Sequence, residues 1–519
     1  MKRNIFITFL SFIILMTSCE DFLMKIPHTK LSDKNFYRNA DEINAAVTGC
    51  YNALLAVKNS KEHTLNEVRS DNAVFPNTDN INVTSLAFYP SVLITEPTND
   101  YVELYWASSY HLISRVNRVI SNLNVVASEN QKWQYEAEIR FLRAWAYFNL
   151  VRYYGDVPLI TEVLNNGKEA REIARTPVSE VYDAIIVDLS TADSLFAELD
   201  TNYKKEYGRI NKWAVKTLLG KVYLTLGRND EAKPLIEDVY KNSGYKLTQN
   251  YGDLFVESLE TTKGAEEIIF PIRFTSGGLG MGNYFSTDCA NIYQNTFGNS
   301  LIYFSNSLRD AYINTSSTTL DKRYKINCSE VTTGHVVSGF NYPVRYLAKM
   351  VGLESNGAGG YKSVKLTIKN DGGLDFPELR FAEVALIYAE LFGEEVGLPV
   401  LNDIRNRAGA PVLTSADIDT KFDGNFQEAV LNEARLELAG ENKRFFDLLR
   451  MGNQYAVNIL TDLLNTEDVY SSLYYIQAYN LAQEVLRNGK VDEWRLLLPI
   501  PFNDIMRSDV LEQNPGYTR

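Results

Sequence analysis

The most constraining feature of this chain is a helical hairpin pattern between residues 213 and 241. Leu219, Gly220, Tyr223, Gly227 and Ala232 recur there at the spacing of two packed helices. A glycine at position 220 allows two helix backbones to approach closely, and Gly227 interrupts the first helix. Tyr223 fills the groove between the helices, and Ala232 permits tight packing of the second one. The pattern therefore predicts a pair of closely packed helices.

The same spacing is typical of the tetratricopeptide repeat, although Trp213 lies three positions ahead of the usual tryptophan. Other segments have a helical period of apolar residues. We expect helices over 41–57, 101–126, 132–154, 381–396, 400–408, 426–438 and 443–451. Another helix is expected to begin at Pro177, with Thr176 as its N-cap. The fold class is therefore mostly α, with a helical repeat scaffold.

Two segments lack this period, 58–100 and 268–376, and each contains many turn-forming residues. We expect a loop-rich elaboration from both, with one short helix near residues 308–313. Long loops in a compact protein are usually functional or disordered. The prediction is a single domain over residues 39–519, with its ligand site in these loops.

The N-terminus has the charge and apolar pattern of a secretory signal peptide. Lys2 and Arg3 precede an apolar stretch, which ends in small residues before Cys19. This arrangement resembles a bacterial lipobox and predicts a signal peptide over 1–18, lipid on Cys19 and a tether over 19–38. An ordinary secretory signal with an incidental cysteine is the alternative. Acidic residues at 20 and 21 resemble a surface-export signal, or else form a plain hydrophilic tether.

Composition argues against several classes of function. The formal charge is −13 with no block of Lys and Arg, so we expect no nucleic-acid partner. Cys50, Cys289 and Cys328 have no spacing of a zinc site or disulfide framework. The four histidines stand outside zinc-protease motifs, and no nucleotide-binding glycine loop is present. We therefore expect no cofactor, no metal and no catalytic residue, and a glycoside hydrolase remains a remote alternative.

Five ordered motifs carry a resemblance to the SusD/RagB family. They are EIRFLRAWAYFNLVRYYGDVPL at 138–159, ELRFAEVALIYAE at 378–390, NDIRNRAG at 402–409, EARLELAGENKRFFDLLR at 433–450, and a closing segment at 498–517 that ends QNPGY. Arg435, Glu437, Arg444, Asp447 and Arg450 resemble an active-site carboxylate cluster, and Arg140, Arg143 and Arg152 are charged residues of the first motif. We expect them instead to form charged pairs that fix helix packing.

The resemblance implies a fold of about four tetratricopeptide-like helix pairs with an irregular elaboration. It also implies a lipid-anchored protein on the outer-membrane surface that captures oligosaccharides for a partner TonB-dependent, SusC-like transporter. Some relatives in this family bind peptides, so a peptide-binding lipoprotein is the main alternative. A helical-repeat scaffold that docks a protein partner is a further binding hypothesis.

A sugar site needs exposed aromatic rings for stacking and polar side chains for the hydroxyl groups. Two loop segments offer both and, by resemblance, belong to regions from which family sites are built. The predicted ligand-binding residues are Asp71, Asn72, Phe75, Tyr89, Tyr293, Phe297 and Tyr303. Each aromatic could instead be a packing anchor, and the oxygen-rich segment 71–80 could hold calcium.

Overall fold

The computed structural model describes most of the chain. The described residues are 36–74, 93–164, 166–199, 206–257, 263–291, 294–313, 321–331, 336–337, 340–341, 344–355, 360–465 and 482–518. The predicted signal peptide, Cys19 and most of the predicted tether lie outside these residues, as do Phe75, Tyr89 and Tyr293. Within the described ranges, no helix has both the length and the apolar character needed to cross a membrane.

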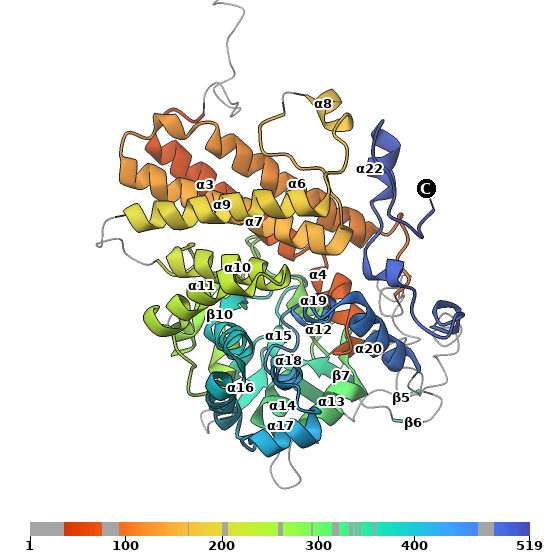
Figure 1. The fold of residues 1–519 in the computed structure, drawn as a ribbon. Coiled ribbons are helices and arrows are strands. Elements are labelled where there is room, and N and C mark those ends of the chain that lie inside the picture. Colours follow the sequence, from red (N-terminus) through yellow and green to blue (C-terminus); the bar gives the residue numbers. More distant parts are fainter. Residues whose placement is uncertain are drawn as a thin grey trace, which may run out of the picture.

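Eight long helices form an array in which each helix packs on the next along the chain (Figure 1). They are α3 (Ala40–Lys58), α6 (Asp100–Ile120), α7 (Glu129–Tyr154), α9 (Val178–Glu198), α10 (Lys212–Thr225), α11 (Asn229–Asn242), α16 (Phe381–Ala408) and α18 (Phe426–Glu437). Taken in chain order they form four pairs, α3 with α6, α7 with α9, α10 with α11, and α16 with α18, and neighbouring pairs also pack on each other, as α6 does on α7. In the described chain this confirms the predicted mostly helical fold with about four helix pairs.

The α10–α11 pair shows why the hairpin pattern requires its small residues. A methyl group at Gly220 would lie 2.6 Å from Cδ1 of Ile236, so a side chain there would push the two helices apart. Gly227 has a φ of 69°, which glycine adopts without strain, and it follows the end of α10. Ala232 is fully buried between the helices. These contacts match the roles predicted from the sequence.

Replacing Gly220 by valine is expected to lower the free energy of unfolding by about 1–3 kcal/mol, because the branched side chain overpacks the helix contact. Urea unfolding followed by circular dichroism would measure the change. Gly167→Val is the matched control, because among the described residues no atom beyond its own chain neighbours and helix backbone lies within 4 Å of the position that its Cβ would take. Equal losses in both variants would contradict the packing argument.

The pair α7 and α9 is held by an ion pair in addition to apolar packing. Asp188 on α9 accepts from Arg143 Nε at 2.7 Å and from Arg140 Nη1 at 2.9 Å, as predicted for charged pairs between helices. Arg152 differs, because its guanidinium lies 3.7 Å from the ring centres of both Phe148 and Phe446. It therefore makes a cation–π contact rather than the predicted charged pair.

The turn after α7 also determines where α9 begins. Gly155 ends α7 with a φ of 71°, as the sequence indicates. The predicted N-cap at Thr176 is wrong, because the N-cap residue is Pro177 and its side chain has no acceptor. Asp156 supplies the acceptor instead: the Val178 backbone N–H donates to its Oδ1 at 2.9 Å.

The first part of the predicted loop 58–100 is compact rather than irregular. Residues 62–65 form the short helix α4 and residues 67–69 the 3-10 turn η1, and both are buried. The strand β1 (Ala73–Val74) then pairs with β3 (Tyr303–Phe304). The expectation of a loop was wrong here because the polar residues of this segment are buried in ion pairs, as Glu62 and Asp71 are, or in hydrogen bonds, as Glu67 and Arg69 are.

The rest of the elaboration consists of short strands and helices. The other antiparallel pairs are β2 (Ile268–Ile272) with β10 (Phe376–Arg380), β4 (Cys328–Val331) with β7 (Val344–Leu347), β5 (Val336–Val337) with β6 (Phe340–Asn341), and β8 (Leu353–Ser355) with β9 (Tyr361–Ser363). The short helices of this part are α12 (Phe285–Cys289), α13 (Asn306–Ile313), α14 (Lys322–Asn327), α15 (Ala348–Val351) and the 3-10 turns η3 (Tyr251–Phe255) and η5 (Lys263–Glu266). The predicted helix near 308–313 is confirmed as α13.

The C-terminal helices follow the predicted boundaries closely. The helix α16 continues through the predicted break at 397–399, and its non-helical residue, Gly393, produces a kink inside the first predicted segment. The remaining elements are α8 (Gly167–Arg171), η2 (Leu123–Val125), α17 (Ser415–Lys421), α19 (Arg444–Arg450), α20 (Asn453–Asn465), η8 (Glu493–Leu496) and α22 (Phe502–Arg507). Most of the tail around α22 is irregular, as its prolines indicate.

Candidate ligand-binding cavity

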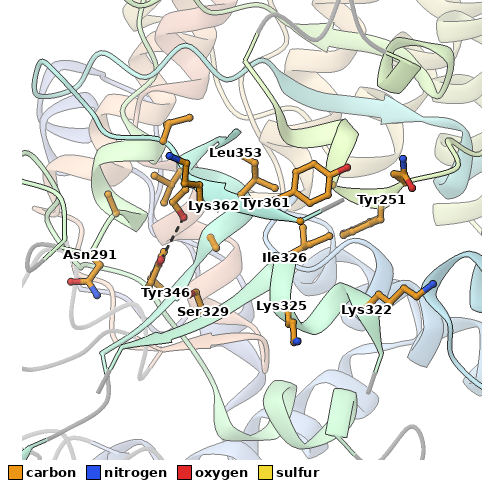
Figure 2. A pocket seen from close by; sticks show the side chains of 18 of the residues that line it. Tyr251, Asn291, Lys322, Lys325, Ile326, Ser329, Tyr346, Leu353, Tyr361 and Lys362 are labelled. Atoms are coloured by element: carbon orange, nitrogen blue, oxygen red, sulfur yellow. Dashed lines mark hydrogen bonds between the residues drawn. The ribbon is translucent and has the colours of Figure 1, made fainter. Parts of the chain in front are cut away.

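A cavity of about 1010 Å³ lies in the elaboration, where segments distant in sequence come together (Figure 2). Its walls come from η3, the segment after α12, α14, β4, β7, α15, the β8–β9 hairpin and the end of α16. Its lining includes Tyr251, Gly252, Asn291, Gln294, Asn295, Asp321, Lys322, Lys325, Tyr346, Tyr361, Lys362, Ser363, Lys365 and Arg407. The mixture of aromatic, amide and charged side chains is typical of a site for a polar ligand with apolar faces.

Three tyrosines contribute aromatic surface to the cavity. Tyr251 and Tyr346 are almost fully buried, and their rings form part of the wall. Tyr361 on β9 is more exposed, and its ring lies against the backbone of Gly252, where a methyl group would lie 2.4 Å from the ring. Tyr361 is therefore the ring best placed to stack against a ligand.

The hydroxyl groups of these tyrosines are held by hydrogen bonds. The Tyr361 hydroxyl donates to Asp253 Oδ1 at 2.6 Å, and burial together with this carboxylate raises the pKa of Tyr361. The ring therefore stays a neutral phenol with a fixed orientation. The Tyr251 hydroxyl donates to the Glu437 carbonyl oxygen at 2.8 Å, and that of Tyr346 donates to Gln294 Oε1 at 3.3 Å.

Amide side chains also line the cavity, and Figure 2 shows Asn291 on the same side as Tyr346. Asn291, Gln294 and Asn295 all line it. The Asn295 Nδ2 donates to the Val364 carbonyl oxygen at 3.3 Å, while its buried Oδ1 accepts no hydrogen bond from the described residues. A buried acceptor of this kind is suited to a ligand hydroxyl group.

A buried ion network lies beneath the cavity and fixes its floor. Glu437 Oε1 accepts from Arg407 at 2.5 Å and from Arg380 at 2.7 Å, and Glu437 Oε2 accepts from Arg323 at 3.0 Å. Burial alone would raise the pKa of Glu437, but the three guanidinium groups lower it well below its usual range. This confirms that Glu437 of the 433–450 motif is a structural charge.

Asp71, predicted to bind ligand, lies in the protein interior. Its Oδ1 accepts from Arg444 Nε at 2.8 Å and its Oδ2 lies 3.2 Å from Arg435 Nε. Burial opposes ionisation, yet these two guanidinium groups outweigh it and lower the pKa of Asp71 to about 2. Asn72 beside it is fully buried, accepts from Arg435 Nε at 3.0 Å and donates to Glu67 Oε1 at 2.9 Å. Both side chains are committed to contacts that join β1 to the C-terminal helices.

The second predicted loop segment lies closer to the cavity. Phe297 is 37% exposed, and Tyr303 is half-buried in β3 opposite Val74. Neither lines the cavity, but Asn291 and Asn295 from the same segment do. Sequence reasoning did not identify Tyr361 or the lysines, although the glycine-rich sequence before Tyr361 and the spacing of Lys322 and Lys325 were visible signals.

Comparison with known proteins agrees with this architecture. The profile described as "SusD family" matches residues 266–517, and the profile described as "Starch-binding associating with outer membrane" matches residues 21–224. SusD-like protein P2 of Formosa agariphila is 25% identical over 98% of this chain and 99% of its own.

The chain belongs to the SusD/RagB family.

Two solved structures have the same fold. A laminarin-binding SusD-like protein has 24% sequence identity and a TM-score of 0.70, over 93% of this chain and 100% of its own. Surface glycan-binding protein A from Bacteroides thetaiotaomicron, solved with laminarihexaose, has 19% identity and a TM-score of 0.70, over 91% of this chain and 99% of its own. At these identities the likeness concerns the fold.

Proposed function

We propose that this SusD-like chain is a cell-surface protein that captures oligosaccharides and delivers them to a TonB-dependent outer-membrane transporter. The observation that carries the proposal is the cavity, which is lined both by the Tyr361 ring and by buried amide groups. Sugar rings have apolar faces that pack on aromatic side chains, and their hydroxyl groups require hydrogen-bond partners around the edge.

The size of the cavity is consistent with a ligand of several sugar rings. Its volume of about 1010 Å³ is at the upper end of the roughly 300–1,000 Å³ of small-ligand sites. The family names and the glycan-bound relatives support a glycan as the ligand. In this account the protein binds its ligand and releases it without changing it.

The same proposal includes a lipid anchor on Cys19 after removal of residues 1–18. Acidic residues 20 and 21 would then direct the lipoprotein to the cell surface, and the segment to residue 38 would be the tether. Acyl chains on one cysteine can hold a protein at a membrane, since each buried CH₂ contributes about 0.8 kcal/mol. A protein tethered this way can cover a transporter in the same membrane and release ligand into it.

Replacing Tyr361 by alanine is expected to weaken oligosaccharide binding about 5- to 30-fold, because a central aromatic contact contributes about 1–2 kcal/mol. A glycan array would identify a ligand for the chain from Glu20 onward, which retains every described residue. Isothermal titration calorimetry would then compare the variants, and a reducing-end assay on the same mixtures is expected to detect no cleavage.

Phe297→Ala is the matched comparison, because Phe297 is an exposed ring from the loop predicted by sequence and lies outside the cavity lining. A loss of affinity only in Phe297→Ala would locate the site on that loop. Tight binding of peptides, with no binding to any glycan, would contradict the proposed function and favour the peptide-binding alternative.

A further inference from the structure

Cationic side chains outnumber acidic ones around the cavity. Its lining contains five cationic side chains and the single carboxylate of Asp321. The whole chain has a formal charge of −13, so the net charge of the cavity lining is opposite in sign to that of the protein. Such a local excess of one charge determines which ligands are attracted.

Part of this charge is neutralised by neighbours. Arg407 is paired with Glu267 at 2.8 Å and with Glu437, and Lys362 is paired with Glu354 at 3.0 Å. Asp321 is itself paired with buried Arg323 at 2.7 Å, so it is not available to the lysines around it.

Three lysines of the cavity lining have no neutralising partner among the described residues. Lys322, Lys325 and Lys365 are exposed, and no carboxylate of the described residues lies within ion-pairing distance of them. They therefore give the cavity a net positive charge that nothing in the described structure compensates.

The two lysines of α14 are presented by a rigid element. Between them Arg323 is fully buried and pairs with Glu433 at 2.7 Å, which anchors α14 to the ion network below the cavity. Lys322 and Lys325 are three residues apart and so lie on one face of the helix. The aliphatic part of Lys322 also packs against Gly409, where a Cβ would lie 3.0 Å from its Cε.

The lysines come from more than one side of the cavity. Figure 2 shows Lys322 and Lys325 along the edge formed by α14, and Lys362 along the β8–β9 hairpin, which also carries Tyr361. Lys365 follows directly after this hairpin. A ligand stacked on the Tyr361 ring would therefore have ammonium groups from two elements within its surroundings.

A neutral sugar needs an aromatic face and hydrogen-bond partners, but it carries no charge that would attract several uncompensated cations. We infer that the cavity binds oligosaccharides that carry acidic groups, either carboxylates of uronic acids or sulfate esters. Lysine serves both, because its ammonium group is a compact point charge without the fixed two-pronged geometry of arginine. The inference rests on the proposed function, because it names the class of oligosaccharide that this cavity takes.

The test is charge reversal at the three unpaired lysines. The triple variant Lys322→Glu, Lys325→Glu, Lys365→Glu is expected to weaken binding of acidic oligosaccharides about 10- to 100-fold, since each exposed ion pair contributes a factor of up to about five and reversal adds repulsion. The matched control is Lys168→Glu, Lys241→Glu, Lys490→Glu, which changes the net charge equally at exposed positions outside the cavity. Thermal unfolding of both variants would show that each is folded.

Calorimetry would compare four probes with the chain from Glu20 onward: oligogalacturonate, a sulfated galactan oligosaccharide, neutral laminarihexaose and a glutamate hexapeptide. The inference expects one acidic oligosaccharide to bind most tightly, and the first two probes distinguish the carboxylate from the sulfate. Its binding should also weaken several-fold with added salt, because the screening length falls from about 10 Å at 0.1 M to about 3 Å at 1 M.

Three results would overturn the inference. Laminarihexaose binding as tightly as the acidic oligosaccharides would remove the role of charge, while leaving the proposed function in place. Equal weakening in the control triple variant would show that the overall field, rather than this cavity, attracts the ligand. Tighter binding of the glutamate peptide than of every oligosaccharide would overturn both the inference and the proposed function.

Discussion

Replacing Glu437 by alanine is expected to lower the free energy of unfolding by about 3–5 kcal/mol, the range for removing one partner of a buried ion pair. Glu437 is fully buried and accepts from Arg323, Arg380 and Arg407. Without this carboxylate, three guanidinium groups lose a shared counter-charge in the buried interior of the protein. Urea unfolding followed by tryptophan fluorescence would measure the loss at neutral pH.

The matched control for this prediction is Glu172→Ala. Glu172 also pairs with a cation, Lys168, but at 3.7 Å and with both side chains mostly exposed. Exposed pairs contribute little, so this variant should stay within about 0.5 kcal/mol of the original protein. A loss below about 1 kcal/mol for Glu437→Ala would contradict the view that this network holds the cavity floor in place.

Asp71→Asn is expected to cost about 3 kcal/mol of stability at pH 7, because it leaves Arg435 and Arg444 buried without their carboxylate. The cost should depend on pH. The pKa of Asp71 is about 2 in the folded protein, below the roughly 3.9 of an unfolded chain. A lowered pKa means that the charge stabilises the fold above about pH 4 and that this contribution is lost as the pH falls to about 2.

The free energies of unfolding of the original protein and Asp71→Asn should therefore differ most at neutral pH and converge as the pH falls toward 2. Urea unfolding at pH 7, 4 and 3 would measure this difference. The folded variant should keep its affinity for the oligosaccharide, because Asp71 does not line the cavity. A variant with unchanged stability but no ligand binding would instead restore Asp71 to its predicted role in the ligand site.

The helical scaffold could be predicted because its determinants are local. The period of apolar residues and the glycines at 220 and 155 act within one helix or one turn, so they are visible in a short stretch of sequence. The kink at Gly393 inside α16 was not predicted, because the expected break lay at 397–399, around Pro399. The four helix pairs follow once such segments are known to stack.

The candidate site could not be predicted in the same way, because its residues meet only in the folded chain. Tyr251 and Tyr361 line one cavity from positions more than one hundred residues apart, and Lys322 comes from a third segment. Asp71 was predicted to bind ligand and is buried instead, because composition does not show whether a segment is exposed. A polar stretch rich in Asp and Asn has the same composition whether it lies on a surface loop or is buried against arginines such as Arg435 and Arg444.

The most direct test of the account is a crystal structure of the protein with the oligosaccharide that binds most tightly. The account predicts a sugar ring stacked on Tyr361 inside the cavity, with an acidic group within about 4 Å, an ion-pairing distance, of the Lys322, Lys325 or Lys365 ammonium groups. An empty cavity, with the oligosaccharide bound over Phe297 and Tyr303 or elsewhere on the surface, would contradict it.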